Sequence, residues 1–328
     1  MKILFSSHFF PPSVGGIEEV SCILAHEFVR QGHDVIVVTQ TRGDAQLPFE
    51  VRRGIRLRDL PALTRWSDIV FHNNISLRTA WPLAWIARPW VVAHHTWIAR
   101  TDGRVAPVDR LKLQAIRGAR NVAVSEAIAE KLGVPARVIP NPYRDDLFCR
   151  TNRGARDGDV LFVGRLVSDK GVDILLDALA AGTMRRATIV GDGPERSALE
   201  VRARSLGVEA TFAGVKRGEE LVHLFNQHRL LVVPSRWEEP FGVVALEGMA
   251  CGCVPLVARA GGLPEAVGEA GATFETGSAQ DLAACMDRLL ADETRLEELR
   301  QRAAPHLERH RAAVIAAQYL QVFEEVLQ

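Results

Sequence analysis

The sequence lacks the features that mark secreted, membrane-spanning and disulfide-linked proteins. Its 328 residues include only five cysteines, an odd number whose spacing matches neither a disulfide framework nor a zinc site. We therefore expect all five to be small buried side chains in a reducing compartment. The longest apolar stretch, residues 79–93, is interrupted by Arg88 and two prolines and is too short to cross a bilayer. The first residues, MKILFSSHFFPP, do not read as a signal peptide, so we expect a cytoplasmic protein.

Net charge is also lacking, because 40 lysines and arginines balance 40 aspartates and glutamates. That balance argues against a nucleic-acid partner. The two halves differ, however: residues 1–150 hold 20 basic and 14 acidic side chains, and the rest holds 20 and 26. Two explanations stay open. Either the basic half meets an anionic substrate or the head groups of an anionic membrane, or the charges are spread unevenly over a solvated surface.

Short apolar runs alternate with helical periodicity along the chain. Residues 2–7 and 34–40 read as buried strands, and residues 17–31 between them read as a helix that Gly32 ends. This βαβ pattern predicts a parallel sheet. Further strands are expected at 67–74, 90–97, 136–142, 159–165, 230–235 and 252–258. Residues 121–134 read as a strand followed by a helix that Ser125 caps, and residues 186–194 read as a strand and a turn.

A chain of this length is too long for one ordinary core, and the polar segment 149–158 is typical of a linker. The predicted fold class is therefore α/β, with two Rossmann-like doubly wound domains facing across a cleft. We expect an N-terminal domain over 1–150 and a C-terminal domain over 151–305. A last helix over 306–328 can pack back on the N-terminal domain.

The most informative segment is WEEPFGVVALEGMACGCVP, residues 237–255. Glu239 lies in a strand-to-helix loop, and Glu247 lies about one turn into the helix. The free N–H groups at the helix start, near Gly242 and Val243, can bind an anion. Glu239 can accept hydrogen bonds from hydroxyls and Glu247 from a diol on the other side of that anion, which together suit a nucleotide sugar. The alternative is that both are surface acids at a helix start, where the macrodipole favours them.

A second segment, FVGRLVSDKG (162–171), places two cations in the loop after the first strand of the same domain. Arg165 can fork onto phosphate oxygens and Lys170 supplies a point charge, which suits a diphosphate. The alternative is an ordinary charged loop in which Lys170 pairs with Asp169.

Two segments of the N-terminal half are weaker signals. In PPSVGG, Gly15 and Gly16 either let the backbone approach a ligand closely or form a plain turn; dinucleotide and P-loop motifs do not match. In VVAHHTW, His94 and His95 point to opposite faces of a strand, so at most one faces the cleft. Trp97 either packs in the core or stacks on a sugar ring.

Taken together, EEPFGVVALEGMACGCVPLVARAGGLPE, FVGRLVSDKG, GDGPE and PPSVGG resemble the GT-B glycosyltransferases of family 4, in the right order and over nearly the whole chain. The resemblance implies a nucleotide-sugar donor held mainly by the C-terminal domain and an acceptor held mainly by the N-terminal domain. It also implies transfer with retention at the anomeric carbon and no required metal. The only D-x-D, Asp157 to Asp159, precedes a strand, whereas a metal-dependent site would follow one.

The resemblance also implies roles for single residues. Glu239 resembles the acid on the donor-sugar hydroxyls, and Glu247 the acid on the nucleotide ribose. Arg165 and Lys170 resemble the diphosphate clamp, and His95 aligns better than His94 with the histidine near the sugar. The other implied donor contacts are Gly15, Gly16, Gly191, Val215, Lys216, Gly242 and Val243. The acceptor side is assigned His94, Trp97 and Asn73, while segment 41–90 matches the family least.

The sequence therefore predicts an enzyme, a retaining glycosyltransferase of hexosyltransferase type. It would move a sugar from a UDP- or GDP-sugar to a glycan or lipid-linked glycan, in polysaccharide or glycoconjugate biosynthesis. The nucleotide sugar is a co-substrate, and no cofactor or metal is expected. Two alternatives stay open: a GT-B nucleotide-sugar epimerase, and a non-catalytic nucleotide-sugar-binding scaffold. Peripheral contact with the inner face of an anionic membrane also stays open.

Overall fold

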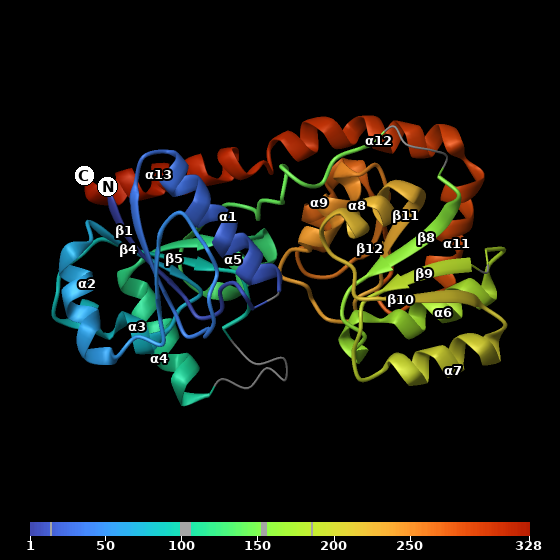
Figure 1. The fold of residues 1–328 in the computed structure, drawn as a ribbon. Helices are drawn as coiled ribbons and strands as arrows, with labels where there is room; N and C mark the ends of the chain where they lie inside the picture. The colour runs from blue at the N-terminus through green and yellow to red at the C-terminus, as the bar shows by residue number, and fades with distance from the viewer. Residues whose placement is uncertain (14, 99–105, 152–155, 185) are drawn as a thin grey trace. The chain divides into compact units, whose positions relative to one another are not determined.

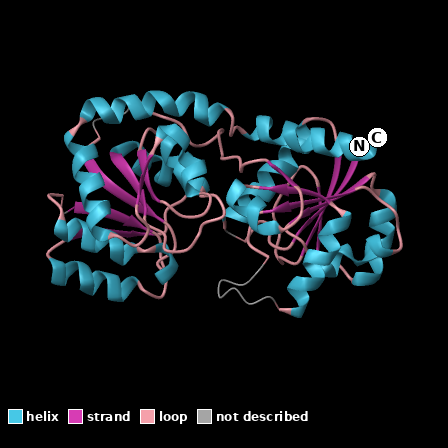
Figure 2. Ribbon diagram, turned by 180° about the vertical axis from the view of Figure 1, so that it is seen from behind, coloured by secondary structure: helices cyan, strands magenta, loops and turns pink. Residues whose placement is uncertain are grey.

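The chain divides into two compact units in the computed structural model. The N-terminal unit comprises Met1–Pro142 and His310–Gln328, and the C-terminal unit comprises Tyr143–Arg309. In each unit helices cover both faces of a parallel sheet (Figures 1 and 2). The residues that the structure describes are 1–13, 15–98, 106–151, 156–184 and 186–328.

The described part of the N-terminal unit has a parallel sheet in the strand order β3-β2-β1-β4-β5-β6-β7. Its strands are β1 (Lys2–Ser7), β2 (Asp34–Thr39), β3 (Glu50–Arg53), β4 (Ile69–Asn73), β5 (Trp90–His94), β6 (Arg120–Ala123) and β7 (Ala136–Val138). Its α-helices are α1 (Gly16–Arg30), α2 (Leu60–Trp66), α3 (Leu77–Ala80), α4 (Pro107–Ala115), α5 (Glu126–Leu132) and α13 (Ala312–Leu327). Short 3-10 helices are η1 (Leu57–Asp59), η2 (Trp81–Ala84) and η3 (Ile116–Gly118).

The described part of the C-terminal unit has a parallel sheet in the order β10-β9-β8-β11-β12-β13. Its strands are β8 (Gly158–Val163), β9 (Arg186–Val190), β10 (Glu209–Gly214), β11 (His228–Val233), β12 (Val254–Ala258) and β13 (Ala272–Phe274). Its α-helices are α6 (Val172–Ala181), α7 (Arg196–Leu206), α8 (Gly218–Gln227), α9 (Val243–Ala250), α10 (Leu263–Val267), α11 (Ala279–Ala291) and α12 (Glu293–Glu308). The 3-10 helices are η4 (Ser168–Lys170) and η5 (Gly268–Ala270).

Both sheets are doubly wound, which confirms the predicted fold class of two Rossmann-like α/β domains. The strand order reverses between β1 and β4 in the first sheet and between β8 and β11 in the second. In open parallel sheets, ligands bind outside the carboxyl ends of the strands at such a reversal. The topology therefore marks one candidate position in each unit.

Several elements differ from the sequence prediction. The strands β3, β10 and β13 were not predicted, because β3 and β13 are short and none of the three contains a long unbroken run of apolar residues. The predicted strand 136–142 ends at Val138, since the prolines that follow cannot donate to the sheet. The cysteines were only partly predicted: none forms a disulfide, but Cys149 is exposed and Cys22 is half-buried, and only Cys251, Cys253 and Cys285 are buried. No helix in the described ranges is long and apolar enough to span a membrane.

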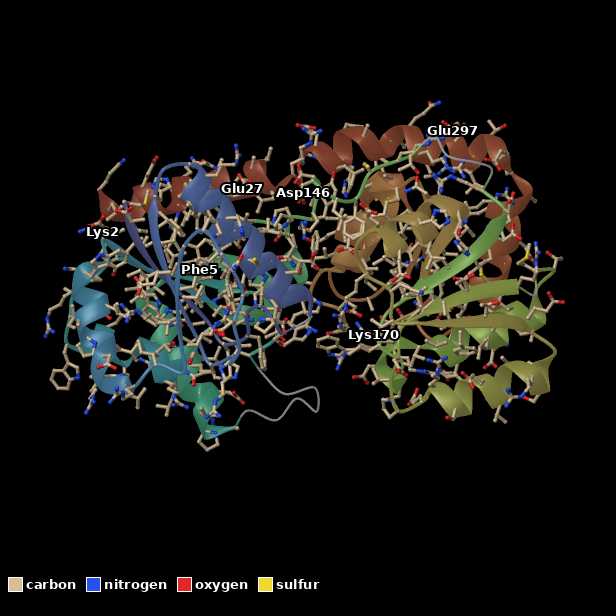
Figure 3. The ribbon with its side chains drawn as sticks, viewed as in Figure 1. Lys2, Phe5, Glu27, Asp146, Lys170 and Glu297 are labelled. Atoms are coloured by element: carbon tan, nitrogen blue, oxygen red, sulfur yellow. The ribbon has the colours of Figure 1, made fainter. Side chains whose placement is uncertain are left out.

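The last helix completes the core of the N-terminal unit. In Figure 1 the red helix α13 runs beside the blue helix α1, and the two helices are in contact. Phe323 is fully buried, with its ring centroid 5.4 Å from that of Phe28 and 5.2 Å from that of Phe71. Phe71 also packs 4.7 Å from Phe5, which Figure 3 labels inside this unit. These aromatic contacts hold the end of the chain on a sheet built from its beginning.

We predict that Phe323→Ala destabilises the N-terminal unit by about 3–5 kcal/mol, because it empties a fully buried aromatic position. Urea unfolding followed by tryptophan fluorescence measures this, since five of the six tryptophans lie in residues 66–97. Leu327→Ala on the same helix is the control, because Leu327 is 42% exposed and should cost less than about 0.5 kcal/mol. Equal losses in both variants would contradict the proposed role of the helix.

Candidate active site

Two loops meet at the strand-order reversal of the C-terminal unit. One follows β8 and leads through η4 to α6; the other follows β11 and leads to α9. Because β8 and β11 are adjacent and parallel, their carboxyl ends lie at the same edge of the sheet. Lys170 and Glu239, 69 residues apart in sequence, therefore come together.

An ion pair joins these two loops. The ammonium of Lys170 lies 2.5 Å from Oε1 of Glu239, and the hydroxyl of Ser235 donates to the same oxygen at 2.8 Å. Figure 3 labels Lys170 in this loop region of the C-terminal unit. The alternative in which Lys170 pairs with Asp169 is wrong, since Lys170 pairs with Glu239. No described residue donates to Oε2 of Glu239, which leaves that oxygen available to a ligand hydroxyl.

Further contacts fix the loops around the pair. The carbonyl of Asp169 accepts hydrogen bonds from the backbone N–H groups of Arg236 at 2.9 Å and of Trp237 at 3.3 Å. The guanidinium of Arg236 also binds both carboxylate oxygens of Asp173 at 2.5 Å. Burial raises the pKa of Asp173, but the hydrogen bonds from Arg236, the positive charge of Arg236 and backbone N–H groups at the start of α6 together lower it by more, so the net shift is downward. Asp173 therefore stays ionised and keeps the two loops together.

Both glutamates of the E-x7-E segment are buried. Glu239 is 9% exposed and Glu247, in α9, is 8% exposed. This excludes the alternative that they are surface acids at a helix start, because carboxylates are rarely buried without a specific partner. Arg165 follows β8 and is exposed, and no carboxylate in the described ranges pairs with its guanidinium. The same edge of the sheet thus presents an unpaired cation beside a buried acid–base pair.

Two glycines shape this edge. Gly191 has φ +135°, and a Cβ there would lie 1.8 Å from the carbonyl oxygen of Gly164. The loop after β9 therefore packs directly on the loop that carries Arg165. The N–H of Gly191 donates to the carbonyl of Gly214, the last residue of β10, at 2.8 Å. Gly242 has φ +110° and precedes Val243, the first residue of α9. Only glycine tolerates these conformations readily, so the helix can begin directly after the buried Glu239 loop.

The remaining predicted donor contacts in this unit lie after β10. Val215 is 54% exposed, so its side chain is accessible to a ligand. Lys216 pairs with Glu220 of α8 at 2.8 Å. Their contact with a nucleotide base stays a prediction.

In the N-terminal unit, Gly15 and Gly16 begin α1 at the reversal of the first sheet. Gly15 is the residue before the helix, and its carbonyl accepts the N–H of Glu19 at 3.1 Å. A Cβ on Gly16 would meet nothing within 4 Å, so the protein's own packing does not require glycine there. The amide of Asn73, at the end of β4, donates to the hydroxyl of Ser21 within a buried polar group. That contact ties β4 to α1.

The two histidines are both buried. Nε2 of His94 lies 3.0 Å from Oδ1 of Asn121. His94 therefore donates a hydrogen bond to this buried side chain. Neither ring nitrogen of His95 has a hydrogen-bond partner in the described part of the chain. The backbone N–H of His95 donates to Oδ1 of Asn74 at 2.7 Å, and Asn74 has the left-handed φ of +66°. His95 is therefore held in place by its backbone, and the side chain of Asn141 lies near its imidazole without a hydrogen bond of normal geometry.

Burial sets the charge of these rings. It lowers the pKa of His95 to about 3, with the neighbouring His94 adding to the effect, and that of His94 to about 4. Both imidazoles are neutral near pH 7, so each can donate one hydrogen bond and accept another. Trp97, the last aromatic predicted for the acceptor side, has the ammonium of Lys131 4.7 Å from its ring centroid.

Three residues that position the site were not predicted from the sequence. Ser235 was read only as a strand end, and Asn74 only as the polar end of another strand. Arg236 was not considered at all. The one available signal was the second asparagine of FHNN, since asparagine is enriched among residues with positive φ. Among the described residues, no group of three His, Cys, Asp or Glu side chains is placed to hold a metal ion.

Buried histidines make the N-terminal unit sensitive to acid. Nε1 of Trp90 donates to Nδ1 of His72 at 3.0 Å, so Nε2 carries the proton and donates to Thr79. Burial lowers the pKa of His72 to about 3, against about 6.5 in the unfolded chain. Between these values the unfolded state binds the additional proton, so stability falls as the pH falls.

We predict that the free energy of unfolding depends less on pH in His72→Gln than in the wild type. Between about pH 6 and pH 4 the slope should be lower by about 1.4 kcal/mol per pH unit. Urea titrations at several pH values, read by tryptophan fluorescence, measure the slope. His8→Gln is the control, because His8 is exposed in the same unit, and its slope should match the wild type. An unchanged slope in His72→Gln would mean that His72 does not titrate as its burial requires.

Comparison with known proteins shows the family of the chain. Residues 144–306 match the family model for glycosyl transferases group 1. The glycogen synthase of Mycobacterium tuberculosis H37Rv is 31% identical over 310 residues, which cover 85% of this chain and 72% of the relative. The chain therefore belongs to the glycosyl transferases group 1 family.

Two further similarities extend over most of the chain. An uncharacterised glycosyltransferase of Methanocaldococcus jannaschii is 28% identical over 326 residues, covering 81% of this chain and 83% of the relative. The crystal structure of Anabaena HepE in complex with UDP has a TM-score of 0.87 at 22% identity, covering 99% of this chain and all of that one. At that identity the likeness concerns the fold, which is that of the GT-B glycosyltransferases.

Proposed function

We propose that this chain is a retaining, metal-independent hexosyltransferase of family 4. It transfers a sugar from a nucleoside-diphosphate donor to a glycan or lipid-linked glycan, in polysaccharide or glycoconjugate biosynthesis. The observation that carries the proposal is the pair formed by Lys170 and Glu239 at the β8/β11 reversal, with Ser235 on the same carboxylate. A cation and an acid held together at the carboxyl edge suit a ligand with phosphates next to hydroxyls.

Each member of the site has a part in this scheme. Arg165 and Lys170 bind the diphosphate, assisted by the first N–H groups of α9 at Gly242 and Val243. The ammonium of Lys170 has three N–H donors, so it can keep its hydrogen bond to Glu239 while it binds a phosphate oxygen. Oε2 of Glu239 accepts a hydroxyl of the donor sugar, and Glu247 accepts the ribose diol.

The chemistry is the exchange of one glycosyl bond for another. The bond from the anomeric carbon to the phosphate oxygen breaks through an oxocarbenium-like state, and a bond to the acceptor oxygen forms on the same face. The acceptor proton passes to the departing phosphate. Cations that are held in place stabilise the negative charge that develops on the leaving phosphate. Removing one such group typically lowers the rate by about 10²–10³.

The donor is proposed to be a uridine diphosphate sugar. The support is HepE, a protein of the same fold whose structures contain UDP and UDP-glucose. Gly15, Gly16, Gly191, Val215 and Lys216 are proposed to complete the donor contacts. GDP-sugars stay the alternative donor.

The acceptor is proposed to bind the N-terminal unit. His95 is a neutral, buried imidazole without a hydrogen-bond partner in the described ranges, so it can donate to or accept from a sugar hydroxyl. Asn73, His94 and Trp97 are proposed to form the acceptor side, where Trp97 offers a ring for stacking. Peripheral contact with an anionic membrane is part of the proposal.

We predict that Glu239→Gln and Lys170→Met each lower the rate of UDP release from UDP-glucose by about 10²–10³ in kcat. The assay needs no added acceptor, because transfer of the glucose to water also releases UDP. The anomeric configuration of the released sugar, measured by NMR, tests whether the reaction retains configuration. Glu238→Gln is the matched control, because this neighbouring acid is exposed and should keep wild-type turnover. Full activity in either site variant would refute the site assignment, and an epimerised donor without release would support the epimerase alternative.

A further inference from the structure

A pocket of about 370 Å³ lies in the N-terminal unit, at the carboxyl end of the edge strand β3. Its polar lining consists of Arg52, Arg53, Arg56 and Asp59, and its apolar floor includes Leu63 of α2. All of these residues fall in segment 41–90, which matches the family least. Three guanidinium groups against one carboxylate make the pocket a place for an anion.

The ion pairs within the pocket are weak and leave the cations available. Arg56 lies 3.9 Å from Asp59, with side chains 72% and 53% exposed. Arg52 pairs with Glu50 at 2.5 Å, with side chains 56% and 47% exposed. Exposed pairs of this kind contribute about 0–1 kcal/mol, so a phosphate can replace the carboxylates at little cost.

Arg53 gives the more specific signal. Its Nη1 donates to the carbonyl of Thr41 at 3.2 Å, which fixes the guanidinium plane. Its Nη2 is buried and has no hydrogen-bond partner in the described part of the chain. Other atoms of the Arg53 side chain line the pocket, so its positive charge is held beside any anion bound there.

Exposed aromatic side chains lie on the neighbouring segment. Leu83 of η2 packs with Leu63 of α2 against the same hydrophobic cluster, so η2 lies beside the helix that lines the pocket. Trp81 at the start of η2 is 39% exposed, and Trp85 directly after it is 85% exposed. The guanidinium of Arg88 holds this segment on α2 through the carbonyls of Arg65 and Ser67. Tryptophan side chains are enriched at membrane–water interfaces, where the indole lies at the level of the lipid head groups.

We propose that the pocket of Arg52, Arg53 and Arg56 binds the phosphate group of an organic phosphate ester. The ester is either the head group of an anionic lipid, with Trp81 and Trp85 at the bilayer interface, or a soluble phosphorylated compound. This inference deepens the membrane and acceptor contacts of the proposed function, but it concerns a site in the N-terminal unit that the donor chemistry does not use.

The experiment compares the full-length wild type with Arg53→Gln and Arg56→Gln. Glycerol 3-phosphate binding is measured by calorimetry, and vesicle binding by co-sedimentation with phosphatidylcholine alone or mixed with phosphatidylglycerol. Each variant should weaken phosphate binding about tenfold, the usual effect of losing one charged hydrogen bond. Arg65→Gln is the control, because Arg65 is exposed on α2 outside the pocket lining and should bind as the wild type does.

The outcomes separate the two sources of phosphate. Loss of binding to the phosphatidylglycerol vesicles in both pocket variants, with a further loss in Trp85→Ala, supports a lipid head group. Loss of glycerol 3-phosphate binding without vesicle binding supports a soluble ester. Binding of both probes that is equal in wild type and pocket variants, or no binding of either, overturns the inference. Stabilisation by UDP, measured on the same samples, reports the donor site separately, so failure of the proposed function is distinguishable.

Discussion

The ion pair between Lys170 and Glu239 joins two loops that are 69 residues apart, and the rest of the candidate site is arranged around it. The two side chains are 22% and 12% exposed, so both lose much of their hydration. Pairs buried in this way rarely repay their desolvation in stability, which favours a functional reason for keeping them. The Arg236–Asp173 contact and the close approach of Gly191 to Gly164 hold the surrounding loops, so the pair is presented at a defined place on the sheet edge.

The two units share one topology. Each contains a doubly wound parallel sheet whose strand order reverses at one point. In the N-terminal unit two glycines at the start of α1 lie at this reversal, and in the C-terminal unit the Lys170–Glu239 ion pair does. The core of the N-terminal unit includes the end of the chain, because Phe323 and Tyr319 of α13 pack against Phe71. Its buried neutral histidines include one structural ring, His72, and one without hydrogen-bond partners in the described ranges, His95.

The fold class could be predicted from the sequence because parallel strands buried on both faces appear as short continuous apolar runs separated by helical periodicity. Strand β3 could not, since EVRR contains one apolar residue and lies at an exposed edge. The partner of Lys170 could not be predicted either. Spacing within one segment suggested Asp169, whereas the true partner is brought close by the pairing of β8 with β11. The burial of both glutamates and the unpartnered Nη2 of Arg53 depend on tertiary packing, to which local sequence gives no guide.

The most direct test is the melting temperature of the protein in the presence of UDP, GDP and ADP, for the wild type and for Lys170→Met. A ligand that binds only the folded state stabilises it by about 2.7 kcal/mol at a hundredfold excess over its dissociation constant. A nucleoside-diphosphate site at the β8/β11 edge predicts a rise with UDP in the wild type, smaller rises with the other two, and loss of the UDP effect in the variant. No rise with any nucleotide, or an equal rise in the variant, would contradict it.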